Sequence, residues 1–126
     1  MNPTLTKNYV AEGAIARYRI VKFGSADGQV LQGAAVSDAL MGVVDLPSDV
    51  AAAANDRVDV VLAGIAFVEA SGVIALGAPV TSNASGQATA AAPAVGTNNR
   101  IIGFAAQAAV AGDVIPVHLA PGQIQG

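Results

Sequence analysis

Glycine interrupts this chain so often that long helices are excluded over most of its length. Fourteen glycines are spread among 126 residues, and each costs about 1 kcal/mol in a helix interior relative to alanine. Between the glycines, the residues alternate with a period of two, which is typical of half-buried β-strands. The 28 alanines favour helix by intrinsic propensity, but the glycine spacing and the alternation outweigh them. The sequence therefore predicts a mainly β chain.

Short strands separated by turns account for most of the chain. The Asp27-Gly28 pair predicts a hairpin, because both residues tolerate positive φ. Residues 90–99 are expected to form an exposed loop. Pro116 lacks an N–H, so its strand is expected at a sheet edge or a bulge. Strands are expected at 14–20, followed by a bulge at 21–23, and at 29–32, 39–44, 57–62, 65–69, 77–89 (two strands and a turn), 100–105 and 114–119.

One short helix is expected over residues 48–54. Ser48 is suited to the N-cap, and Asp49 in the first turn complements the helix dipole. The predicted fold class is thus mainly β, a small β-barrel or β-sandwich with this single helix.

Charged residues are scarce for a chain of this size. They make up 12% of the sequence, and apolar residues make up 53%, whereas an ordinary domain is about 25% charged. We expect part of the surface to be covered by copies of the chain or by a partner. The alternative is that weakly apolar alanine and glycine inflate the apolar fraction without forming adhesive patches.

The charges are also unevenly placed, because four of the six basic residues lie within the first 22 positions against one acid, Glu12. This asymmetry indicates a partner of opposite charge. Nucleic acid is not expected, because the net charge is −3, the pI is near 4.7, and few aromatic side chains could stack on bases. No stretch approaches the roughly 20 apolar residues of a membrane span, and no secretory signal is expected at the N-terminus. Synthesis in the cytoplasm follows as an expectation.

The residue types needed for catalysis are poorly supplied. The chain has no cysteine and one histidine, His118, so neither a metal site nor a cofactor is predicted. No serine lies in a G-x-S-x-G motif, and the glycine spacings lack the Lys-Ser/Thr of a phosphate loop. Neighbouring carboxylates such as Asp45 and Asp49 suit caps and strand ends. The sequence therefore predicts a protein that is not an enzyme, and His118 beside a serine in a pocket would be the sign of a hydrolase instead.

Several segments taken together resemble the capsid cement, or head decoration, proteins of tailed bacteriophages. Each motif consists of small, common residues, but their order and spacing span nearly the whole chain. They are the opening 2–15, the strand 57–61 with 64–66, the segment 77–82 followed by Gly86 and Ala88, the segment 100–105 and the closing 120–126.

The resemblance implies a β-tulip-like domain on the exterior of the virion that binds the major capsid protein and stabilises the shell. It also implies a homo-oligomer, with a trimer favoured and a dimer possible, and no catalytic residues. The alternative is a host-surface or carbohydrate-binding β-module displayed on the virion, although an aromatic content of 4% disfavours sugar stacking.

These expectations divide the chain into an extended N-terminal arm (1–13), a single β-rich domain (14–120) and an irregular C-terminal tail (121–126). We hypothesise that the arm is loose in solution and orders on the capsid, and that the arginines of the first strand face the capsid or a neighbouring subunit. Solvated protection of a strand edge is an equally good explanation of those arginines. The hypothetical capsid-binding residues are Pro3, Leu5, Lys7, Tyr9, Arg17 and Arg19.

Overall fold

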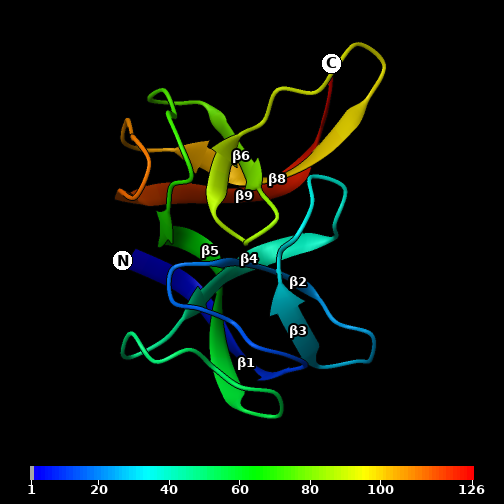
Figure 1. Cartoon of the computed structure of the whole chain (residues 1–126), viewed down its shortest axis with the longest axis vertical. Helices are drawn as coiled ribbons and strands as arrows, with labels where there is room; N and C mark the ends of the chain where they lie inside the picture. Colours follow the sequence, from blue (N-terminus) through cyan, green and yellow to red (C-terminus); the bar gives the residue numbers. More distant parts are fainter. Residues whose placement is uncertain (1) are drawn as a thin grey trace.

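In the computed structural model, residues 2–126 are described, and they form one mixed sheet of nine strands (Figure 1). The pairings run in a circuit from β1 through β3, β2, β4 and β5 back to β1, and β9, β8, β6 and β7 follow on from β5. The mainly β prediction is confirmed, and the choice between barrel and sandwich stays a prediction. The strands are β1 (Asn2–Ala11), β2 (Ile20–Phe23), β3 (Gln29–Gln32), β4 (Leu40–Asp45), β5 (Arg57–Glu69), β6 (Pro79–Ser82), β7 (Ala88–Ala90), β8 (Asn98–Ala105) and β9 (Val114–Gln125).

Two apolar clusters lie on opposite faces of the central strands. The first cluster, here called the upper core, includes Val68, Val80, Ile102 and Ile115. The second, here called the lower core, includes Ile15, Val30 and Val58 among others. Strand β4 contributes to both, because successive side chains of a strand point to opposite faces. All of Leu40–Val44 is consequently buried, which explains why this strand is continuously apolar in sequence.

Strand β5 joins the two cores. Its first part places Val58 and Val60 in the lower core, and its later residues Val61, Ala66 and Val68 lie in the upper core. The sequence predicts two strands here, separated at Gly64, but the structure has one continuous strand. Gly64 has a φ of 95°, and a Cβ there would lie 2.4 Å from the carbonyl oxygen of Asn2. The glycine therefore permits close approach of β1 and does not end the strand.

The predicted helix at 48–54 is wrong, since the described residues 2–126 contain no helix. Ala52 forms an antiparallel bridge with Ile15 instead, with N–H to carbonyl distances of 2.8 and 3.0 Å. A helix of two turns has too few internal hydrogen bonds to offset its nucleation cost, so pairing with a distant segment prevails. No helix in these residues is long and apolar enough to span a membrane.

The hairpin prediction at Asp27-Gly28 is confirmed. Strands β2 and β3 pair antiparallel, Gly28 has a φ of 77°, and the Gly24 N–H donates to the Gln29 carbonyl at 2.8 Å.

The predicted strand at 14–20 is wrong over most of its length. Apart from the bridge at Ile15, residues 14–19 are irregular, with a turn in which Tyr18 has a φ of 60°.

Strand β9 departs from two expectations. It lies between β5 and β8 and not at a sheet edge. It also includes residues 121–125, so the prediction of an irregular tail is wrong for these residues. Pro116 is tolerated because its carbonyl accepts from the Ala106 N–H at 3.0 Å, just beyond the end of β8. The N–H and the carbonyl of an antiparallel strand residue point to the same side. The N–H that Pro116 lacks would therefore point to the side where β8 has already ended.

The domain boundaries at 13 and 120 stay predictions, and Met1 lies outside the described residues.

Candidate functional site

Strand β1 is the most open strand of the lower part of the molecule. Residues 2–8 are all exposed, and the side chain of Leu5 is 54% exposed. One edge of β1 pairs with β5 from Asn2 to Val10, whereas β3 pairs only with Val10 and Ala11. Within the described chain, the second edge of residues 2–9 therefore faces no other strand.

The exposed edge carries features that discourage pairing with a foreign strand. Pro3 lacks an N–H, Lys7 places a charge on the strand, and the register with β5 shifts between Pro3 and Leu5 and again between Leu5 and Thr6. Proline, lysine and bulges are common protections of edge strands. A partner is consequently expected to contact the side chains of β1 more readily than its backbone.

Lys7 and Tyr9 lie together beside the β2–β3 hairpin. The Lys7 ammonium is 5.3 Å from the centroid of the Tyr9 ring, a distance suited to a cation–π contact. Tyr9 is only 9% exposed and packs in the lower core. Both residues line a cleft of about 430 Å³ with the hairpin turn, residues 23–28. The Tyr9 ring thus packs against the Lys7 ammonium group.

A second cleft, of about 460 Å³, lies at the start of β1. Its walls include Pro3, Arg17, Tyr18 and Phe67, so the structure brings together two residues that the sequence analysis singled out in separate segments. The Arg17 guanidinium is 4.7 Å from the centroid of the Tyr18 ring and 3.1 Å from Asp49 Oδ1. Asp49 is 92% exposed, which makes this a weak surface pair.

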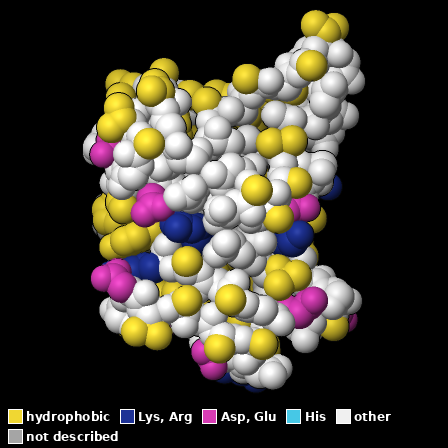
Figure 2. Space-filling view, viewed as in Figure 1, with side chains coloured by type: hydrophobic (Ala, Val, Ile, Leu, Met, Phe, Trp, Pro, Cys, Tyr) yellow, Lys and Arg dark blue, Asp and Glu magenta, His cyan; other side chains and the backbone are white. Residues whose placement is uncertain are grey.

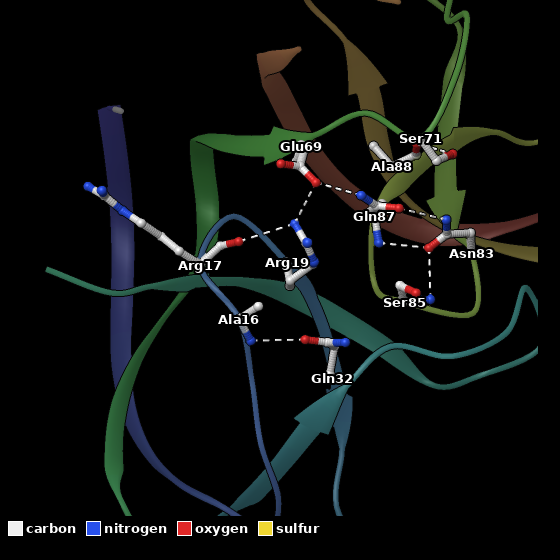
Figure 3. A network of polar contacts seen from close by, with 10 residues as sticks. All are labelled: Ala16, Arg17, Arg19, Gln32, Glu69, Ser71, Asn83, Ser85, Gln87 and Ala88. Atoms are coloured by element: carbon white, nitrogen blue, oxygen red, sulfur yellow. Dashed lines mark hydrogen bonds and ion pairs between the residues drawn. The ribbon is translucent and has the colours of Figure 1, made fainter. Parts of the chain in front are cut away.

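Arg19 is held in an internal network and does not face outward. Its Nη1 lies 3.1 Å from Glu69 Oε2 and donates to the Arg17 carbonyl at 3.3 Å. Gln87 Nε2 also donates to Glu69, and Asn83 donates to Gln87. Figure 3 shows Arg17 pointing away from this network, toward β1. The network ties the turn at 17–19 to β5 and to the β6–β7 connection.

Glu12 anchors the β2–β3 hairpin turn at the end of β1. Its Oε1 accepts from the Ser25 N–H at 2.6 Å and from the Ser25 hydroxyl at 2.8 Å. These hydrogen bonds, with a smaller contribution from Lys22, hold the pKa of Glu12 below its ordinary value. They stabilise the charged form.

His118 lies exposed on β9, opposite Phe104 on one side and Ile65 on the other. The hydroxyls of Ser71 and Ser82 donate to backbone carbonyls at 3.1 and 2.9 Å. Residues 2–126 contain no group of three or more metal-ligating side chains.

The charged residues are concentrated in the first half of the chain. Twelve of the fifteen Asp, Glu, Lys and Arg residues lie within residues 1–62, and residues 63–126 contain only Glu69, Arg100 and Asp113. In Figure 2 the charged side chains are concentrated over the middle and lower parts of this face. The basic cluster at the N-terminus is one part of this separation, which is visible in the linear sequence.

A family model described as "Phage cement protein" matches residues 1–119. This chain belongs to the phage cement protein family. It is therefore a capsid-associated structural protein of a phage, as the resemblance implied. No curated protein matches the chain. Among solved structures, the chain is similar to the base of the head fibre protein gp8.5 of bacteriophage phi29, with a TM-score of 0.65 and 16% identity over 97% of this chain and 98% of that chain. At this identity the likeness shows a shared fold.

Proposed function

We propose that this cement protein binds the outer surface of the assembled capsid and stabilises the shell by clamping neighbouring subunits of the major capsid protein. It acts without catalysis and as a homo-oligomer, with a trimer favoured over a dimer. The observation that carries this proposal is the exposed outer strand β1, which presents apolar and basic side chains beside an unpaired edge.

Four residues supply the proposed contacts with the capsid. Leu5, which is 54% exposed, buries apolar surface, and Pro3 stiffens the start of the strand beside it. Lys7 and Arg17 meet acidic groups of the capsid protein. Arg17 can exchange Asp49 for such a group at small cost, because the existing pair is largely exposed.

Two of the hypothetical binding residues have supporting roles in this proposal. Tyr9 is buried in the lower core and positions Lys7. Arg19 is held by Glu69 and orders the turn that carries Arg17.

Oligomerisation makes these small contact sets effective. An exposed strand with one apolar anchor and two cations binds weakly alone. Joining several copies makes the later contacts intramolecular, which raises avidity by roughly 10²–10⁴. Binding to several capsid subunits at once opposes their separation, because the linked sites favour the associated shell.

The test is cosedimentation with mature capsids that lack the protein, combined with thermal melting of the decorated shell. We expect the double variant Leu5→Asp, Lys7→Glu to lose capsid occupancy and to leave the shell as labile as the undecorated one. Point substitutions are preferred to deleting the strand, because β1 also pairs with β5 and contributes Tyr9 to the lower core.

Val95→Asp is the matched control, since Val95 is 96% exposed and lies in the 91–97 connection, away from β1. Its occupancy should equal that of the wild type. Unchanged occupancy of the double variant would contradict the proposed role of β1, and wild-type protein that fails to sediment with capsids would contradict the proposed function itself.

A further inference from the structure

The outward face of the upper strands is apolar. A sheet face that meets water normally carries polar side chains. Here Phe67 lies opposite Pro116, Phe104 lies beside His118 and Pro79, and Val114 is 39% exposed. The other face of the same strands packs in the upper core through residues such as Val68, Ile115 and Val117. The apolar positions are therefore additional to those that the core requires.

This apolar surface continues into the two connections beyond β5 and β9. Ile74 and Ala109 form an antiparallel bridge that resumes the register of β5 with β9, and both point into the upper core. Their neighbours Val73 and Val110 point outward, 80% and 58% exposed. Hydrophobic side chains gather over the upper left of Figure 2, where these connections lie in Figure 1.

Few charges lie on or beside this surface. Glu69, which pairs with Val114, is engaged by Arg19 at 3.1 Å, and the exposed Asp113, next to Val114, accepts from the Val110 N–H at 3.0 Å. A free surface of a small domain is typically a quarter to a third charged. Exposed apolar patches rimmed by polar residues mark sites of protein association.

We propose that this surface, here called the neutral face and defined by Val73, Phe104, Val110, Val114 and Pro116, is where copies of the protein associate with one another. The inference deepens the proposed function and rests on its oligomer. A second copy is the occupant that charge complementarity favours, because two copies of a surface with so few charges bring little unpaired charge together. The charged lower part is left free for the capsid.

The position of the neutral face also fits the proposed avidity. Ile65 of β5 pairs with Asn2 of β1 on one side and with His118 of β9 on the other, so the start of β1 lies at the rim of the face. Association through the neutral face would therefore bring the β1 strands of neighbouring copies to the edges of one assembly. A stable interface needs about 800 Å² from each partner, a modest share of the 5929 Å² accessible surface of this chain.

The first test is molar mass by light scattering for the full chain. Wild-type protein should have the mass of an oligomer, and the double variant Phe104→Asp, Val114→Asp should have the mass of a monomer at the same concentration. Phe23→Asp is the matched control, because Phe23 is 58% exposed on β2 and should leave the mass unchanged. A monomeric wild type, or a folded double variant that keeps the oligomer mass, would overturn the proposal.

A second test does not depend on disruptive substitutions. The chain has no cysteine, so a single introduced thiol reports one position. Val114→Cys should give crosslinked dimers with a short bismaleimide, whereas Val50→Cys, which is 77% exposed in the first half, should give few. Equal crosslinking at the two positions would overturn the proposal. Capsid cosedimentation of the same proteins separates the two ideas, since an oligomer that ignores capsids contradicts only the proposed function.

Discussion

The first and second halves of this protein share one sheet but differ in what their surfaces can do. Residues 1–62 hold most of the charge, and residues 63–126 hold three charged residues and an apolar outward face. The lower core is built from the first half alone, whereas the upper core combines residues of both halves, so the contrast lies in the surfaces. If the proposals hold, a small sheet protein can present different partners with different surfaces while one long strand, β5, joins its two cores.

The largest expected effect comes from separating β4 from β5, the two strands that each contribute side chains to both cores. Gly42 on β4 lies against β5, and a Cβ there would be 2.3 Å from the Val61 carbonyl oxygen. Gly42→Ala should lower the free energy of unfolding by about 3 kcal/mol, because the two backbones must separate. Urea unfolding measures this. Gly72→Ala is the control, since nothing lies within 4 Å of its Cβ position, and a change below about 0.5 kcal/mol is expected there.

The next effect separates the roles of the two surfaces. The neutral-face variant Phe104→Asp, Val114→Asp should keep its β1 contacts but lose avidity, which lowers apparent capsid affinity by roughly 10²-fold or more. The β1 variant Leu5→Asp, Lys7→Glu should lose affinity with its mass unchanged. Titration of capsids with labelled protein, alongside light scattering, measures both. A β1 variant that also becomes monomeric would show that the two surfaces are not independent.

A smaller effect is expected in the network that links the halves. Arg19→Ala removes the cationic partner of Glu69 and leaves only the Gln87 amide. Because both side chains of the ion pair are largely buried, at 16% and 28% exposed, we expect a loss of about 1 kcal/mol in unfolding free energy. Arg17→Ala removes a pair whose acid is 92% exposed and should cost less than about 0.5 kcal/mol. Chemical denaturation of the two variants compares them directly. Equal losses would refute the contrast.

The smallest effect concerns pH and the charged half. The pKa of Glu12 is lowered in the folded protein by Ser25, so its charge stabilises the fold above the ordinary glutamate pKa, and this contribution disappears as the pH falls through the lowered value. Thermal melting from about pH 7 down to about pH 3 should show wild type more stable than Glu12→Gln at neutral pH, with the two curves converging in acid. A gap that widens in acid would give the opposite sign.

Local signals predicted the turns better than the strand lengths. The Asp27-Gly28 hairpin could be identified because turn preference is a property of adjacent residues, and Gly28 does take a positive φ. Gly64 looked like a strand end, but its role depends on the backbone of β1, more than fifty residues earlier in sequence. Residues 48–54 carry the local signals of a helix, but the bridge between Ala52 and Ile15 forms in its place.

The binding role of the six hypothetical residues stays a prediction, but the structure places them in different surroundings. Leu5 and Lys7 are exposed on β1, whereas Tyr9 is in the lower core and Arg19 is bound to Glu69. Burial and ion pairing depend on which segments meet, so periodicity along one strand could not assign them. The arginines at 17 and 19 were expected on a strand face, and they flank a turn with Tyr18 at positive φ instead.

The sequence by itself determined the β class, the main hairpin, the scarcity of charge and the family resemblance, because glycine spacing, turn chemistry and composition are properties of neighbouring residues or of the whole chain. Only the tertiary structure decided that β5 serves two cores, that Pro3 and Arg17 share a cleft, and that the apolar excess of the second half gathers on one outward face. These features arise from pairings between distant segments, and the face on which a strand residue lies is fixed by its register with those partners.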